Sequence, residues 1–111
     1  MRYAEWRVEV ASEAVEAEIK ALPADTQARY LRLVDLIVTH GPRALGMPHA
    51  RPLEGKLWEL RMRGRDGIAR AVYVTASGRR VVVLHAFVKK TQKTPRAAIE
   101  TAKKRMKEAE L

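Results

Sequence analysis

The chain has 111 residues, of which 47% are hydrophobic and 32% charged, and this size and mixture predict a single globular domain spanning residues 1–111. It contains no cysteine, which excludes a disulfide framework and a thiolate zinc site. Its formal net charge of +9 favours an acidic partner, above all nucleic acid or an acidic protein, and less so a membrane surface.

The N-terminal part of the chain predicts a strand followed by two helices. In the stretch EWRVEV, apolar and charged residues alternate from Trp6 to Val10, which is the pattern of a half-buried strand. Ser12 can cap a short amphipathic helix that ends at Pro23. Asp25 or Thr26 can cap a second helix, which has a broad apolar stripe and is predicted to end at HGP.

The middle of the chain predicts a loop and then a meander of three strands. The segment from Arg43 to Gly55 contains two prolines and two glycines and is predicted to be a loop. KLWELRMR and IARAVYVT follow as strands joined by the turn GRDG, and RVVVLHAFV follows the turn ASGR. The last strand is apolar on both faces except at His85, so we predict it to be the central one.

The chain ends in a basic amphipathic helix, with Thr94 as its predicted N-cap and Pro95 at its first position. The predicted order is therefore β-α-α-β-β-β-α. This is an α+β fold, with an antiparallel sheet of about four strands and with its two N-terminal helices and its C-terminal helix on one face of the sheet.

Positive charge is concentrated in the C-terminal two-thirds of the chain. Residues 1–40 contain five basic and seven acidic side chains, whereas residues 41–111 contain 17 and six. Six basic residues are predicted to lie on neighbouring strands or just beyond the last one: Arg61, Arg63, Arg70, Lys89, Lys90 and Lys93. Such a cluster suits several phosphates of one nucleic-acid strand, and ordinary solvated charges on an exposed sheet face are the alternative.

A cluster of basic residues can catalyse RNA cleavage as well as bind RNA. RNA is cut without a metal when its 2'-hydroxyl attacks the adjacent phosphate and the developing charge is neutralised. Arginine binds phosphate through two parallel hydrogen bonds, and lysine can act as a point charge or carry a proton. His85 is a candidate acid or base, although a lone histidine on an apolar strand is more often a hydrogen-bonded core residue. The three histidines lie far apart in the sequence, and neither a metal site nor a cofactor is predicted.

Two large aromatic residues on the predicted strands, Trp58 and Tyr73, have two interpretations. Each could stack on a nucleobase, or pack in the core as aromatic residues on strands usually do. Tyr73 is the better candidate for RNA binding, because its hydroxyl is predicted to neighbour the arginine-bearing hairpin.

Three segments carry a family resemblance: LEGKLWELRMRG, then ARAVYV, then VVVLHAFVKKTQKTPRAAIETAKKRM. The most specific parts are LHAFVKKTQKTP and the A-x-x-R of Ala102 to Arg105, and the R-x-V-Y of Arg70 to Tyr73 supports them. In this order and spacing the segments resemble the phage-derived branch of the RelE/HigB-like toxins of bacterial type II toxin–antitoxin systems. The resemblance covers most of the chain.

The resemblance implies a compact RelE-like fold and a ribosome-dependent endoribonuclease that cleaves messenger RNA and leaves a 2',3'-cyclic phosphate. The family's basic functional residues fall on Arg61, Arg70, Lys89 and Lys90. Arg70 would hold the scissile phosphate and Arg61 would clamp the transition state. Either of the two lysines would serve as base or leaving-group acid.

Further RNA contacts and partners are expected on the same basis. The predicted RNA-binding residues are Arg63, Tyr73, Lys93 and Lys56. The resemblance implies a cognate helix-turn-helix antitoxin, whose acidic surface would suit the net charge of +9, and it favours a heterotetramer with that antitoxin on operator DNA. Messenger RNA and the ribosome are the other expected partners. No signal peptide or membrane span is recognisable, so we expect a cytoplasmic protein that does not bind membranes.

Two alternative functions stay open at this point. The same scaffold carries ParE-like toxins that inhibit DNA gyrase without cutting RNA, so the fold does not decide the chemistry. The other alternative is a basic module that binds nucleic acid without catalysis.

Overall fold

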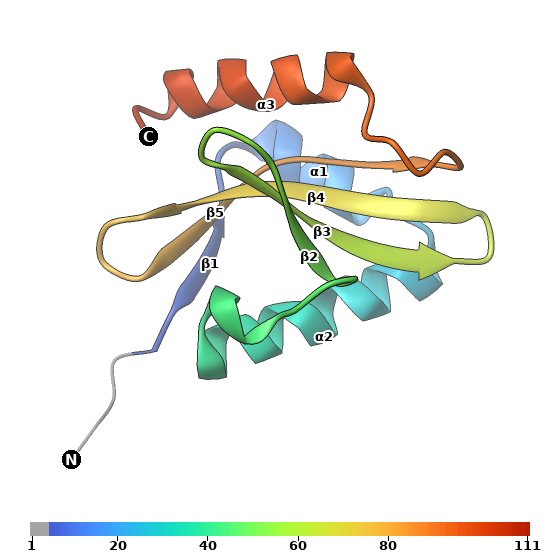
Figure 1. The fold of residues 1–111 in the computed structure, drawn as a ribbon, viewed down its shortest axis with the longest axis horizontal. Coiled ribbons are helices and arrows are strands. Elements are labelled where there is room, and N and C mark those ends of the chain that lie inside the picture. The colour runs from blue at the N-terminus through green and yellow to red at the C-terminus, as the bar shows by residue number, and fades with distance from the viewer. Residues whose placement is uncertain (1–4) are drawn as a thin grey trace.

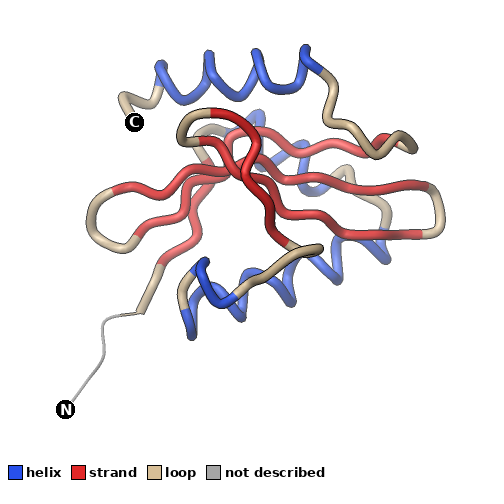
Figure 2. The backbone as a smooth tube through the Cα atoms, viewed as in Figure 1, coloured by secondary structure: helices blue, strands red, loops and turns tan. Residues whose placement is uncertain are grey.

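The computed structural model describes residues 5–111, which form one mixed sheet and three α-helices (Figures 1 and 2). The strands are β1 (Arg7–Val10), β2 (Ala50–Glu54), β3 (Leu57–Gly64), β4 (Gly67–Ala76) and β5 (Arg80–Lys89). The helices are α1 (Glu13–Lys20), α2 (Ala24–His40) and α3 (Arg96–Glu108), with a short 3₁₀ turn, η1 (Pro42–Ala44). The strand order is β1-β5-β4-β3-β2. The α+β fold class predicted from the sequence is confirmed.

The sheet differs from the predicted one in two respects. It has five strands, because the segment predicted to be a loop contains β2. Pro52 does not prevent this pairing, because β2 is an edge strand that needs hydrogen bonds on one side only. In addition, β1 runs parallel to β5, while all other neighbouring strands are antiparallel.

The prediction that all helices lie on one face is wrong. Figure 1 shows α2 and α3 on opposite sides of the sheet. Residues of α1 and α2, such as Val15 and Ile37, pack with Leu60 and Val83 on one face, whereas Ala102 of α3 packs with a second apolar cluster on the other. The three last strands have apolar residues on both faces, and both faces therefore need a cover.

The central strand is β4, not β5 as predicted. Every residue of β4 from Ile68 to Val74 is buried. β1 pairs with the first part of β5, from Arg80 to Val83, and within the described residues no strand lies beside the second part of β5 on that side. Glu18 of α1 lies at this edge and accepts a hydrogen bond from the backbone N–H of Ala86 at 3.0 Å.

Both helix starts that bear on the site differ from the prediction. α2 begins at Ala24, and the Asp25 carboxylate accepts hydrogen bonds from the backbone N–H groups of Thr26 and Arg65, both at 2.8 Å, which lower its pKa. This contact ties α2 to the β3–β4 turn, where a Cβ on Gly64 would lie 2.4 Å from Thr26. α3 begins at Arg96, and Pro95 rather than Thr94 occupies its N-cap position.

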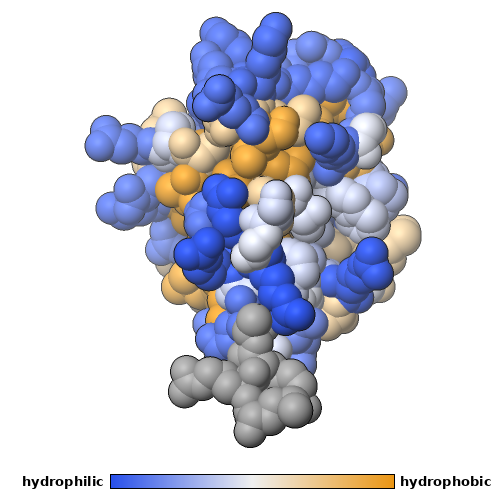
Figure 3. Space-filling view, turned by 90° about the vertical axis from the view of Figure 1, so that its left-hand side faces the viewer, coloured by the Kyte–Doolittle hydropathy of each residue, from blue (hydrophilic) through white to orange (hydrophobic). Residues whose placement is uncertain are grey.

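Hydrophilic side chains dominate the surface around α3. Figure 3 shows the end of the molecule that carries the β4–β5 hairpin, with a band of apolar residues below the hydrophilic top. Within residues 5–111, no helix is long and apolar enough to cross a membrane.

Candidate nucleic-acid interface

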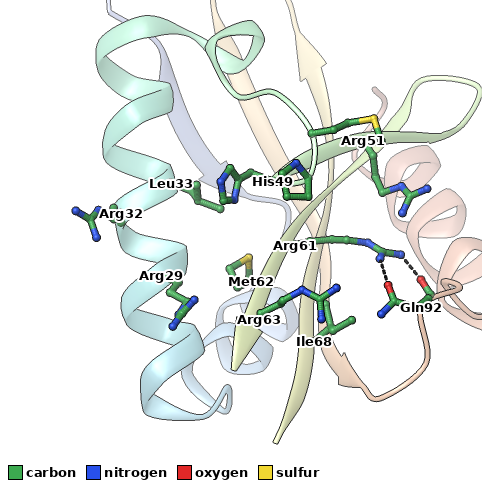
Figure 4. Close-up of a pocket in the computed structure, with 12 residues that line it drawn as sticks. Arg29, Arg32, Leu33, His49, Arg51, Arg61, Met62, Arg63, Ile68 and Gln92 are labelled. Carbon is green, nitrogen blue, oxygen red and sulfur yellow. Dashed lines mark hydrogen bonds between the residues drawn. The ribbon is translucent and has the colours of Figure 1, made fainter. Parts of the chain in front are cut away.

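A cleft of about 520 Å³ lies at the edge of β3, next to α2 and the β5–α3 loop (Figure 4). β2 pairs with β3 only as far as Leu60, so the later part of β3 remains accessible from this edge. Five arginines line the cleft: Arg29 and Arg32 of α2, Arg51 of β2, and Arg61 and Arg63 of β3. Among the described residues that line it there is no aspartate or glutamate, so the cleft concentrates positive charge.

Figure 4 shows how these arginines are distributed around the edge of β3. Arg51, Arg61 and Arg63 lie on the side of the β5–α3 loop, where Gln92 is found, and Arg29 and Arg32 lie on α2 across the strand edge. His49 also lines the cleft, and its carbonyl accepts a hydrogen bond from the Arg61 backbone N–H at 2.9 Å. Among the described residues, none of Arg29, Arg32 and Arg63 forms an ion pair.

Arg61 is held by contacts on both sides of its guanidinium. Its Nε donates to Glu59 at 3.0 Å, its Nη1 donates to the side-chain oxygen of Gln92 at 3.2 Å, and its Nη2 donates to the Gln92 carbonyl. Only 10% of the side chain is exposed. The Gln92 oxygens therefore occupy positions where phosphate oxygens could bind the same nitrogens.

Glu59 is the centre of this network, and it is fully buried. Besides Arg61, its carboxylate accepts the Thr94 hydroxyl at 2.6 Å and lies 3.8 Å from Nε of Arg70. A buried carboxylate is tolerated only with such partners. This explains why Thr94 does not cap α3: its hydroxyl is committed to Glu59, which fixes the start of α3 against the sheet.

Arg70 does not face the cleft, contrary to the prediction that it holds the scissile phosphate. It is fully buried, and its Nη2 donates to the carbonyls of Thr91 and Gln92, the latter at 2.9 Å. Burial lowers the pKa of Arg70, the charge of Arg61 lowers it further, and Glu59 opposes both. Its Nε has no hydrogen-bond partner within the described part of the chain. In this structure Arg70 anchors the β5–α3 loop from beneath.

The structure brings only some of the predicted lysines close to the cleft. Lys90 shares a hollow of about 410 Å³ with Arg63 and Gln92, and this hollow adjoins the arginine cleft. Lys89, the last residue of β5, and Lys93, in the β5–α3 loop, are exposed but line neither hollow. Lys56 lies in the β2–β3 turn, at the opposite end of β3 from Arg63.

Tyr73 is not part of this surface, and the expectation that its hydroxyl neighbours the arginines is wrong. It is 98% buried in the core cluster on the α2 face, because strand alternation points it away from the face that carries Arg61 and Arg70. Burial raises its pKa to about 12, which keeps the phenol neutral.

His85 takes part in a hydrogen-bonded cluster with Glu18 and Arg105. Its Nδ1 lies 2.9 Å from a Glu18 oxygen that also accepts Arg105 Nη1 at 2.9 Å, and Arg105 donates to the Leu84 carbonyl at 3.0 Å. These contacts join α1, β5 and α3, so they favour the hydrogen-bonded interpretation of His85. The arginine of the A-x-x-R motif thus holds α3 to the rest of the fold.

Sequence reasoning missed several residues of the cleft: Arg29, Arg32, His49, Arg51 and Gln92. A signal existed for the helix, where Arg29 and Arg32 are three residues apart and so share one face. No local signal identifies Arg51 or Gln92, since both reach the cleft through long-range pairing. Within residues 5–111, no three His, Asp or Glu side chains are grouped to hold a metal ion.

Comparisons with known proteins agree with this fold. Residues 17–107 match the family described as "Phage derived protein Gp49-like (DUF891)". The crystal structure of an archaeal RelE-RelB complex from Pyrococcus horikoshii OT3 contains a chain that is similar in fold, with a TM-score of 0.56 and 21% sequence identity over 80% of this chain and 99% of that one. No curated protein matches the sequence. Because the family match spans most of the chain, the protein belongs to the phage-derived Gp49-like family of RelE/HigB-type toxins.

Proposed function

We propose that this toxin is an endoribonuclease that binds messenger RNA in the arginine cleft and cuts it without a metal ion. The observation that carries the proposal is a cleft lined by five arginines and no carboxylate. Arginines that share one concave surface attract a polyanion, and they can neutralise charge that develops on a phosphate.

The proposed reaction is an internal transfer at phosphorus. The 2'-oxygen forms a bond to phosphorus, the bond to the 5'-oxygen breaks, and the products are a 2',3'-cyclic phosphate and a 5'-hydroxyl. A base takes the 2'-proton and an acid supplies a proton to the leaving oxygen. Arg61 and Arg63 would bind the phosphate oxygens, and Lys90, which faces the adjoining hollow, is the preferred proton carrier, with Lys89 as the second candidate.

This chemistry requires the β5–α3 loop to move so that Gln92 releases Arg61. The outer nitrogens of Arg61 contact Gln92, and an RNA phosphate would replace these oxygens with its own. Arg70, beneath the loop, would act as a positioning residue that sets where the loop carbonyls lie. This role replaces direct binding of the scissile phosphate by Arg70.

Two partners extend the proposal. The similar archaeal chain was crystallised as a RelE-RelB complex, which supports a protein antitoxin for the present chain as well. An acidic antitoxin surface would complement the net charge of +9. The ribosome would present messenger RNA to the cleft and align the 2'-hydroxyl with the scissile phosphate.

Cell-free translation with a defined messenger RNA tests the proposal. The wild-type chain should produce new 5' ends, mapped by primer extension, and the cleavage rate should fall about 100- to 1,000-fold in Arg61→Ala. Lys104→Ala removes a positive charge from the exposed face of α3 and should leave cleavage unchanged.

The same protein is then assayed with DNA gyrase on supercoiled DNA. Inhibition of gyrase without any cleavage of messenger RNA would overturn the proposal in favour of a ParE-like toxin. RNA binding without cleavage, with or without ribosomes, would reduce it to a binding module.

A further inference from the structure

A separate hollow, of about 550 Å³, lies on the α2 face and is lined by aromatic residues. Trp6, Trp58 and Tyr73 contribute rings to it, and Arg43 contributes a guanidinium. The chain has only two tryptophans, and both line this aromatic pocket. Its volume lies within the range that holds a small ligand of nucleotide size.

Both tryptophans are held in place and still reach solvent. Trp58 lies between its cross-strand neighbours Pro52 and Tyr73, yet 39% of it is exposed. The Trp6 ring packs on the backbone of Gly41, where a Cβ would lie 2.9 Å from Nε1. Ordered indole rings with an exposed part provide a stacking surface at little cost in side-chain entropy.

Arg43 gives the aromatic pocket a charge preference. It is exposed, and among residues 5–111 no carboxylate forms an ion pair with it. The other lining residues in the described part of the chain carry no charge, so these residues combine apolar rings with one cation. This combination suits a flat aromatic ligand that carries a phosphate, and it disfavours an acidic or aliphatic peptide, which would leave the rings or the cation without a matching group.

The aromatic pocket and the arginine cleft are bordered by one segment of the chain. The segment from Pro42 to His49 lies between them: Arg43 and Leu45 line the pocket, and Met47 and His49 line the cleft. Met62, which lines the cleft, lies on the same face of β3 as Trp58 and four residues further along, which corresponds to about 13 Å of strand. One extended RNA strand can therefore reach both hollows.

We propose that the aromatic pocket binds an unpaired base of the RNA strand whose phosphates occupy the arginine cleft, with Trp58 stacking on the base and Arg43 contacting the neighbouring phosphate. The inference rests on the proposed function and deepens it, because it adds a second contact on the same substrate. Such a base site would make the toxin selective for single-stranded RNA, since a base that is stacked within a duplex cannot stack on a protein ring.

Intrinsic fluorescence provides a direct test, because every tryptophan of the chain reports on the pocket. A short unstructured RNA should quench the fluorescence in a saturable manner, whereas inorganic phosphate and an abasic RNA of the same length should not. Trp58→Ala should weaken binding of the RNA by roughly 5- to 150-fold, the range expected for loss of one stacked base, and Trp58→Phe should restore part of the affinity.

Matched variants separate the pocket from the cleft and from the fold. Leu31→Ala removes an exposed apolar side chain that lines neither hollow and should leave binding unchanged. Binding is followed by fluorescence anisotropy of labelled RNA, and circular dichroism melting checks that each variant is folded.

The outcomes distinguish this inference from the proposed function. Equal binding of intact and abasic RNA, or unchanged affinity in Trp58→Ala, would overturn the base site while messenger RNA cleavage could still occur. Saturable quenching that is lost in Trp58→Ala would support the base site even if no cleavage were found. If free RNA does not bind at all, the base site is overturned, and cleavage in cell-free translation then decides the proposed function separately.

Discussion

The arginines beneath the β5–α3 loop and the arginines of the cleft differ in their partners. Arg61 and Arg70 share the buried carboxylate of Glu59 and donate to loop oxygens. Arg29, Arg32 and Arg63 lie at or near the same strand edge, yet they form no ion pair within the described residues. The first group is directed inward at the protein and the second group is available to a ligand.

Because their partners differ, substitutions in the two groups of arginines should affect different properties: the stability of the fold for the first group and RNA binding for the second. A buried arginine that loses its carboxylate becomes an uncompensated charge, so changes to the first group should act mainly on folding. An exposed arginine without a partner contributes little to stability, so changes to the second group should act mainly on RNA affinity. Arg61 belongs to both groups, since it also lines the cleft.

The largest expected effect comes from removing the shared carboxylate. Glu59→Ala should lower the free energy of unfolding by about 3–5 kcal/mol, because Arg70 would stay buried without its counter-charge. Urea denaturation measures the loss. Glu59→Gln keeps an oxygen for Thr94 and should lose less, while an unchanged denaturation midpoint in Glu59→Ala would show that the network is not needed for folding.

A smaller effect is expected at the contact that joins α1 to α3. Burial alone would raise the pKa of Glu18, but hydrogen bonds from Arg105, His85 and Ala86 outweigh it and hold the pKa below the ordinary value of 4.5. A lowered pKa means that the carboxylate stabilises the fold above pH 4.5, and that this contribution is lost as the pH falls below that value.

Glu18→Gln should therefore be less stable than the wild type near neutral pH, by on the order of 1 kcal/mol. The difference should shrink as the pH is lowered below 4.5, as measured by unfolding at a series of pH values. Glu16→Gln is the matched control, because within residues 5–111 the carboxylate of Glu16 forms an ion pair only with Lys20, and that pair is exposed. A difference that grows with acidity would contradict the assignment.

The smallest change in stability is expected in the cleft. Arg63→Ala should leave the unfolding midpoint unchanged but should reduce the slope of log affinity for single-stranded RNA against log salt concentration by about 0.7. Binding is measured at several salt concentrations, with Lys104→Ala as a charge-matched control. If the slope is the same in wild type and Arg63→Ala, this arginine does not contact a phosphate.

The sequence predicted the elements whose patterns are local. GRDG and ASGR mark two hairpin turns, and the structure places β3, β4 and β5 on either side of them. β2 escaped prediction because ARPLE contains a proline and does not alternate, and because its pairing with β3 is set by the neighbouring strand. The parallel pairing of β1 with β5 is equally non-local, since about 70 residues separate the two strands.

The candidate site could be predicted only in part, because some of its residues follow from local strand patterns and others from non-local contacts. Arg61 and Arg63 both line the cleft, because strand alternation puts them on the same face of β3. The pattern also put Arg70 on a face with apolar neighbours, and its burial follows from that. Glu59 and Gln92 could not be identified, because their roles arise only when the β5–α3 loop closes over β3.

The accessible edge of β3 has a consequence for behaviour at high concentration. Beyond Arg61, whose N–H binds His49, the rest of β3 has no strand beside it on this side within the described chain. Exposed edges of this kind invite a second copy to add its own strand and begin an aggregate. Here such a copy would bring its own arginines against the first set, so like-charge repulsion keeps this edge from pairing with itself.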